Sequence, residues 1–432
     1  MTSALSSPRL RRVIVAYTVN RLGTWFGTIA LSLAVFDHTH SSLAVAAVLI
    51  ASQVVPAFVV PAVVARAEAS KRGRELSGLY FFEGAVTAVL PLLLWNFWLP
   101  GLLFLVALDG TAALAASALL RTEAAKIARA ELDGDGDPGA AEQKANAALN
   151  IAFSGTFVIG PVLAGAIVAS AGAATALFID AGTFLICGVL LVDLHPRVEE
   201  AGGDTVGARL RAAWRHIKSV PALRALLLAQ AIGLVFFESA APIEVAYAKR
   251  SLLAGDRGYG LLVTAWGVGV VAGSIVFARA GRRLGLMLTA GTFAIGAAYL
   301  GFAAAPTLLI AAGVAVVGGV GNGVQFAPVI SGVQRLTPQP LQGRVMGALE
   351  SLSAVSPAVG LALGGALVAL SSPRTAFAVV GAGAALTTLL FARVHLDRVA
   401  PPQATEGGDA PPAPPAERRS AREPSVGAPP QR

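Results

Sequence analysis

The chain has 432 residues, of which 55% are hydrophobic and 13% are charged, and its mean hydropathy is +0.69. These few charges cannot cover the surface of a soluble globule of this length, so the composition predicts an integral membrane protein. The formal net charge of +8 does not indicate a nucleic-acid partner, because the basic residues gather on one alternating set of loops, as in membrane proteins.

Apolar stretches of bilayer-crossing length recur along the chain in two groups of six. A transmembrane helix needs about 20 predominantly apolar residues. The first group is predicted at about 13–36, 42–65, 76–99, 101–120, 148–170 and 173–193. The second group is predicted at about 223–247, 259–280, 285–305, 307–331, 346–370 and 375–394.

The two groups share a short internal repeat. The segment AGAIVA at 164–169 reappears 200 positions later as GGALVA at 364–369, and Gly160 is echoed by Gly360. Self-similarity of this kind indicates a duplicated unit, so we predict an all-α membrane protein with twelve transmembrane helices in two pseudo-symmetric six-helix bundles. The predicted division is an N-terminal segment at 1–12, a bundle at 13–193, a linker at 194–222, a bundle at 223–398 and a tail at 399–432.

The loops determine the predicted orientation, because Lys and Arg are enriched on the cytoplasmic side of membrane proteins. With the N-terminus placed inside, almost all of the 33 basic residues fall on the cytoplasmic side. Both termini are therefore predicted to be cytoplasmic, and the protein is expected in the cell (inner) membrane. The basic residues that fall elsewhere are Lys249, Arg250, Arg257 and Arg374 outside and Arg21 within a span.

The linker and the tail differ in composition. Apolar residues recur at helical spacing from Leu210 to Ile217, with basic residues on the other faces. This pattern predicts an amphipathic helix at 208–218 on the inner membrane surface, and a plain solvated linker is the alternative. The tail at 399–432 is rich in Pro, Ala and charged residues, which predicts disorder.

Ionisable residues lie inside several predicted spans, where each charge costs about 2.5–3.5 kcal/mol on insertion scales and normally faces a partner or a wet cavity. Arg21 and Asp109 fall in the middle zone of the bilayer, at depths that allow them to pair. The pair either locks the bundle or opens when Asp109, or an unpaired acid such as Glu238, takes up a proton. The full set within the spans is Arg21, Glu83, Asp109, Asp180, Glu238 and Glu244.

Over residues 10–398 the pattern of spans and connections resembles the major facilitator superfamily. The segment GTFVIGPVLAG is similar to the Gly-Pro signature that antiporter branches of that superfamily carry on the fifth helix, with Ala164 replacing the first glycine of its terminal pair. In that family the signature marks exporters and relates to packing between the fifth and eighth helices. The resemblance therefore implies export. The matching residues are Gly155, Gly160, Pro161 and Gly165.

A second similarity is a short basic loop that the superfamily carries between the eighth and ninth helices. Ala278 stands where an aspartate is usual in that loop. The segments RLGTWFG at 21–27 and QGRVMG at 342–347 are similar to a branch that contains siderophore exporters and macrolide efflux proteins. The loop residues that match are Arg279, Gly281, Arg282 and Arg283.

The resemblance implies alternating access, in which two halves rock about a central site near the midplane. In this family the first, fourth, seventh and tenth helices line the cavity, and its aromatic and polar residues would suit amphipathic or cationic organic molecules. The proton-coupling candidates are Arg21, Asp109, Glu238 and Glu83. The cavity candidates are Trp25, Phe236, Phe237, Asn322, Gln325 and Phe326.

Together these residues predict a proton-coupled exporter of small amphipathic organic molecules, such as drugs, macrolides or siderophore-like compounds. No nucleotide-binding loop is present, so protons are the expected coupling ion. We expect a monomer in the lipid bilayer with no cofactor, no metal site and no enzymatic activity. Two alternatives stay open: a nutrient or metabolite uptake transporter of the same fold, and a non-transporting membrane sensor or membrane-embedded enzyme.

Overall fold

The computed structural model describes residues 7–69, 74–132, 138–194, 215–280 and 283–392. Over these residues it contains 12 helices that are long and apolar enough to cross a membrane, which confirms the number of spans that hydropathy predicts. The described helices belong to one compact unit.

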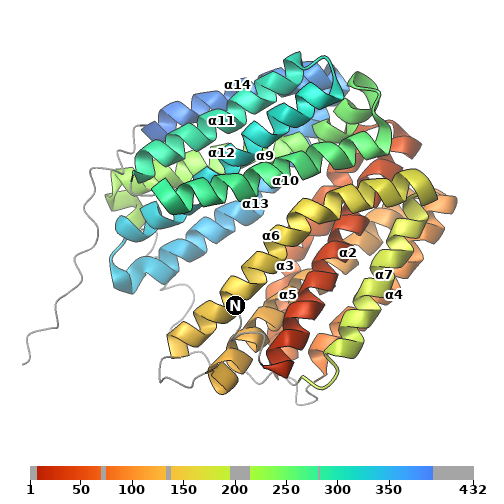
Figure 1. The fold of residues 1–432 in the computed structure, drawn as a ribbon, viewed down its shortest axis with the longest axis vertical. Coiled ribbons are helices and arrows are strands. Elements are labelled where there is room, and N and C mark those ends of the chain that lie inside the picture. The colour runs from red at the N-terminus through yellow and green to blue at the C-terminus, as the bar shows by residue number, and fades with distance from the viewer. Residues whose placement is uncertain (1–6, 70–73, 133–137, 195–214, 281–282, 393–432) are drawn as a thin grey trace, which may run out of the picture. The chain divides into compact units, whose positions relative to one another are not determined.

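The helices follow one another along the chain with short connections. The first six spans are formed by α2 (Pro8–Thr39), α3 (Ser42–Ala69), α4 (Glu75–Trp95), α5 (Leu99–Leu132), α6 (Pro138–Ala171) and α7 (Ala173–Leu190). The second six are formed by α9 (Pro221–Ala246), α10 (Gly255–Ala280), α11 (Leu284–Ala304), α12 (Leu308–Arg335), α13 (Gln339–Leu370) and α14 (Pro373–Ala392). A π-helical turn, η1 (Tyr247–Ser251), follows α9. Figure 1 shows α2–α7 gathered in a first set of helices and α9–α14 in a second set.

Several helices extend beyond the predicted spans. Helix α2 begins at Pro8, before the span predicted from residue 13, because Ser7 caps it: the Leu10 amide donates to Ser7 Oγ at 3.0 Å, which satisfies a free N–H of the first turn. Helices α5 and α6 also continue past the apolar stretches, because hydropathy marks the membrane-crossing part of a helix whereas its backbone hydrogen bonds continue through polar residues.

Parts of two sequence predictions lie outside the described residues. Of the predicted amphipathic helix, residues 208–214 are not described, whereas 215–219 are helical. The tail at 399–432 also lies outside the described residues, so both assignments stay predictions.

The two helix sets meet where small residues let backbones approach. Helix α6 lies against α10, and α3 lies against α13. A Cβ added to Gly260 of α10 would lie 2.7 Å from the Pro161 carbonyl oxygen and 3.1 Å from the Cα of Gly165 on α6. At the other seam, a Cβ on Gly365 of α13 would lie 3.0 Å from the carbonyl oxygen of Ser42 on α3. Close helix packing in membranes depends on such small residues.

We predict that Gly260→Ala lowers the melting temperature of the detergent-purified protein, because the added methyl group overlaps the Pro161 carbonyl and overpacking costs about 1–3 kcal/mol. The matched control is Gly155→Ala, since an added Cβ there meets nothing within 4 Å and alanine favours a helix over glycine. Equal melting temperatures for the two variants would show that the α6–α10 contact is not tightly packed.

Candidate functional site

A central cavity of about 640 Å³ lies between the two helix sets. Its volume falls in the range of small-molecule sites. Its lining comes from every helix of the first set and from α9, α10, α11 and α13 of the second set. All six ionisable residues predicted within the spans reach this cavity, as expected for charges that need a wet surface inside a membrane. They are Arg21, Glu83, Asp109, Asp180, Glu238 and Glu244.

Hydroxyl donors and close helix packing position two of the carboxylates. Thr87 Oγ1 on α4 donates a hydrogen bond of 2.6 Å to Asp109 Oδ1 on α5. Asp180 of α7 is 3% exposed and lies against α2, where a Cβ added to Gly23 or Gly27 would overlap its carboxylate. The glycines of the RLGTWFG segment therefore make room for an acid from another helix.

Glu83 and Arg21 have buried polar atoms without partners. Glu83 is 1% exposed, and neither of its carboxylate oxygens has a hydrogen-bond partner in the described part of the chain. The Arg21 guanidinium lies 5.4 Å from the ring centroid of Tyr17 and 5.7 Å from that of Phe153. Buried polar groups without partners are costly, so these two side chains mark a place where a proton or a ligand would be stabilising.

The predicted partners Arg21 and Asp109 share the cavity without contacting each other. Within the described residues no ion pair joins them, because Asp109 is bonded to Thr87 and Arg21 rests on the rings of Tyr17 and Phe153. In this conformation the Arg21 guanidinium lies over two aromatic faces, whose attraction stabilises its charge.

Aromatic residues form much of the remaining lining. In the second set, the ring centroid of Trp266 lies 6.0 Å from that of Phe237 and 5.6 Å from that of Tyr299, on which it is stacked. Tyr299 also donates a hydrogen bond of 3.3 Å to the Phe237 carbonyl oxygen. In the first set, Trp25 packs edge-on against Phe157 at 5.0 Å. Trp25 and Phe237 thus lie on the cavity with their partners.

The other sequence candidates lie away from the central cavity or outside the described residues. Helix α12 does not contribute to the described lining, so Asn322 and Gln325 do not reach it. The Gln325 amide instead donates to Gln230 Oε1 at 3.2 Å. Phe236 packs against Gly383 of α14. Arg279 and Arg283 are exposed, whereas Gly281, Arg282 and the Phe326 side chain are not described.

Six aromatic residues of the lining were not among the cavity candidates: Phe153, Phe157, Phe184, Tyr259, Trp266 and Tyr299. A signal for two of them was present, because Tyr259, Val263 and Trp266 recur at positions i, i+4 and i+7 and so share one face of α10. Tyr299 lies on an apolar helix with no pattern in the sequence that indicates a cavity residue, and the structure places it there by its stacking on Trp266.

Charged residues join the helix sets at the end of the molecule where α2 ends, here called the Asp37 end. Lys249 Nζ of η1 lies 2.5 Å from Asp37 Oδ1 of α2 and 2.7 Å from Asp256 Oδ1 of α10. Arg250 donates to the His40 carbonyl oxygen, and its guanidinium lies 4.9 Å from the Phe36 ring centroid. The π-helical turn brings both basic side chains to this end.

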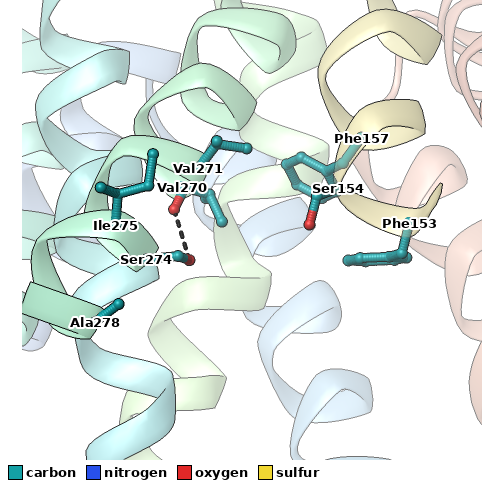
Figure 2. Close-up of a pocket in the computed structure, with 8 residues that line it drawn as sticks. All are labelled: Phe153, Ser154, Phe157, Val270, Val271, Ser274, Ile275 and Ala278. Atoms are coloured by element: carbon teal, nitrogen blue, oxygen red, sulfur yellow. Dashed lines mark hydrogen bonds between the residues drawn. The ribbon is translucent and has the colours of Figure 1, made fainter. Parts of the chain in front are cut away.

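A second cavity of about 250 Å³ lies between α6 and α10 (Figure 2). Its lining is mostly apolar, and Ser274 donates to the Val270 carbonyl oxygen at 2.9 Å. Phe153 and Phe157 line both this cavity and the central one. These two rings therefore form the wall that the cavities share.

Residues 228–426 match the family model described as Major Facilitator Superfamily. The second half of this chain is therefore similar in sequence to the Major Facilitator Superfamily. Its sequence is also 28% identical over 239 residues to "Multidrug efflux pump Tap" of Mycolicibacterium fortuitum, a match that covers 52% of this chain and 56% of the pump. The chain thus matches about half the length of that relative.

Solved structures of transporters share the fold of this chain at low sequence identity. The chain is similar to an auto inhibited POT family peptide transporter, with a TM-score of 0.70 and 13% identity, covering 90% of this chain and 96% of that one. A mutant of the nucleoside transporter NupG matches with a TM-score of 0.69 and 13% identity, and the match covers 90% of this chain and 100% of that one. A bacterial homologue of the iron transporter ferroportin, in an inward-facing state, matches with a TM-score of 0.66 and 17% identity. This match covers 89% of this chain and 98% of that one. The family and structural neighbours are transporters.

We predict that Lys249→Gln opens the Asp37 end of the protein, because it removes the positive charge that holds Asp37 and Asp256. Spin labels at Leu43→Cys and Leu253→Cys, in a Cys187→Ser background, would report the distance by pulsed electron resonance. We expect a larger fraction of long distances in Lys249→Gln.

The matched control for this charge change is Arg257→Gln. Arg257 is exposed near the same end and has no ion pair among the described residues. Identical distance distributions in the Lys249 and Arg257 variants would show that the ion pairs do not hold this end closed.

Proposed function

We propose that this protein is a proton-coupled secondary transporter that exports small amphipathic organic molecules by alternating access. The observation that carries the proposal is the central cavity, which is lined by both helix sets and by all six intramembrane ionisable residues. A cavity between two sets of helices can be exposed to one side of the membrane at a time if the sets rock against each other. The sequence similarity to a multidrug efflux pump favours export of organic compounds.

The two helix sets serve in this proposal as pseudo-symmetric halves. Helix α6 packs on α10 and α13 packs on α3, and the internal repeat lies on α6 and α13. If a six-helix unit was duplicated, a twofold axis between the two copies would relate the α6–α10 contact to the α3–α13 contact. In this arrangement both termini are cytoplasmic, the Asp37 end faces outward, and a monomer in the cell membrane contains the complete pathway.

Protons act on the first helix set in this mechanism. Glu83 has two buried oxygens without partners, and it shares the cavity with Asp109 and Arg21. Proton uptake would remove carboxylate charge from an interior where unpaired charge is costly. In another conformation Arg21 would leave the rings of Tyr17 and Phe153 and pair with Asp109, which links proton binding to helix movement.

Uptake of a nutrient or metabolite is the second candidate function. Solved structures of the same fold include nucleoside and peptide transporters, and similarity of fold does not determine the direction of transport. The two candidates differ in whether the compound accumulates in the cell or leaves it. Cells lacking the gene would grow poorly on the compound under uptake and would become sensitive to it under export.

We predict that adding an exported compound to inverted vesicles dissipates a pre-formed pH gradient when this protein is present. Proton antiport requires protons to leave the vesicle as the compound enters, so a pH-sensitive dye in the lumen would report the exchange. Vesicles with the Glu83→Gln variant are the control. A pH gradient that stays constant with every transported compound would exclude antiport.

We predict that Arg21→Gln and Asp109→Asn each reduce transport at least tenfold, because each removes one partner of the proposed alternate pair. The exchanged variant, with Asp at 21 and Arg at 109, should recover part of the activity, since it restores attraction across the same two helices. Solute flux into proteoliposomes measures this effect. Wild-type flux in both single variants would leave the pair without a role in transport.

A further inference from the structure

The second cavity of about 250 Å³, here called the side cavity, begins where the contact between α6 and α10 widens (Figure 2). Closer to the Asp37 end the two helices touch. A Cβ added to Gly260 would lie 2.7 Å from the Pro161 carbonyl oxygen, and one added to Gly267 would lie 2.9 Å from the Phe157 carbonyl oxygen. Farther along α10, the stretch 270–278 lines a space between the same two helices. The α6–α10 seam is therefore closed at one end and open at the other.

The lining of the side cavity suits hydrocarbon and offers little to a polar ligand. Six of its eight side chains are apolar, and Ser154 and Ser274 are the other two. The Ser274 hydroxyl donates to the Val270 carbonyl oxygen of its own helix at 2.9 Å, so it needs no further acceptor. A buried water requires about two to four polar partners, whereas an apolar cavity stays dry and takes up apolar molecules.

The side cavity lies in the part of the molecule that crosses the bilayer. The membrane spans of the two helices are Lys144–Ala171 and Gly255–Arg279, and every lining residue falls within one of them. Ile275 of the lining is 47% exposed, and in a membrane-spanning segment an exposed apolar side chain faces lipid. The cavity is thus continuous with the hydrocarbon of the bilayer.

We propose that the side cavity binds an acyl chain of a membrane lipid. The chain enters from the bilayer beside Ile275 and lies against Phe153 and Phe157. It fills a space whose lining would otherwise lack packing contacts on one side. A chain already dissolved in the bilayer loses no hydration on entering. The proposal does not rest on the proposed transport function, because an acyl chain can occupy this site whatever compound the central cavity binds.

The bound chain contacts the wall that the two cavities share. Phe153 and Phe157 line both cavities. The Phe153 ring centroid lies 5.7 Å from the Arg21 guanidinium, and Phe157 packs edge-on against Trp25 at 5.0 Å. A chain in the side cavity therefore supports the ring on which the intramembrane arginine rests, and this side chain links lipid occupancy to the central cavity.

Photolabelling in lipid nanodiscs tests the site. Full-length protein is placed in phosphatidylcholine nanodiscs that contain a small fraction of a photolipid, phosphatidylcholine with a diazirine in the middle of one acyl chain, and adducts are mapped by mass spectrometry. Ile275 and Val276 are neighbours on α10 and are 47% and 46% exposed, but Val276 does not belong to the described lining. We expect about tenfold more adducts at Ile275, because a chain held in a cavity stays beside it whereas surface lipid exchanges.

A variant that fills the side cavity locates the binding. Ser154→Phe should reduce the adducts at Ile275 about tenfold, because the added ring occupies the space of the chain. The matched control is Ser170→Phe, since Ser170 is also an exposed serine of α6 but lies outside the described lining. It should leave the labelling of Ile275 unchanged. Ser274→Phe serves if Ser154→Phe does not elute as a monodisperse protein.

The outcomes separate an acyl chain from other occupants. Preferential labelling of Ile275 that Ser154→Phe removes supports the site. Equal labelling of Ile275 and Val276 in the wild type, or undiminished labelling of Ile275 in Ser154→Phe, overturns it. A compact apolar probe, trifluoromethylphenyl diazirine, is used in parallel, and selective labelling of Ile275 by this probe but not by the photolipid also overturns the acyl-chain assignment. No outcome depends on solute flux, so a failure of the transport proposal leaves this test unaffected.

Discussion

The burial of ionisable side chains inside a bilayer is the constraint on which the structure depends. Lipid offers no hydrogen bonds, so each charged group must face a partner or a water-accessible interior. Glu83, Asp109 and Glu244 come from three different helices and still reach one cavity. That convergence requires two helix sets that touch along narrow seams and leave space between them.

Glycine makes those seams possible. At Gly165 and Gly260 the backbones of α6 and α10 approach closely enough that a single methyl group would overlap the opposite chain. Seams of this kind hold two helix sets together over few residues, which is compatible with movement of one set against the other. The Asp37–Lys249 ion pair adds a polar contact at one end, and such a contact can break in water at a lower cost than a packed apolar surface.

The sequence predicted the spans and the ionisable residues of the cavity because both follow from a single physical rule about apolar length and charge burial. It did not predict which face each residue occupies. Arg21 and Asp109 both line the cavity, yet the Arg21 side chain lies against Tyr17, one turn earlier on α2, and against Phe153 of α6. The depth of a residue in the bilayer follows from its position along a span, whereas the direction of its side chain depends on how the helices pack. For this reason the sequence did not predict that Gln325 contacts Gln230 and not the cavity.

The two cavity walls, one from each helix set, are chemically unequal. The first set combines Arg21 with carboxylates that accept hydroxyl donors or lie against glycine, as Asp109 and Asp180 do. The second set combines Glu238 and Glu244 with a stacked aromatic wall. A group that must exchange protons benefits from fixed donors and a nearby cation, whereas a wall that contacts an amphipathic molecule benefits from flat rings. In the proposed transport mechanism the first helix set would therefore exchange protons and the second would contact the cargo, so the shared cavity would couple the two without direct contact between their sites.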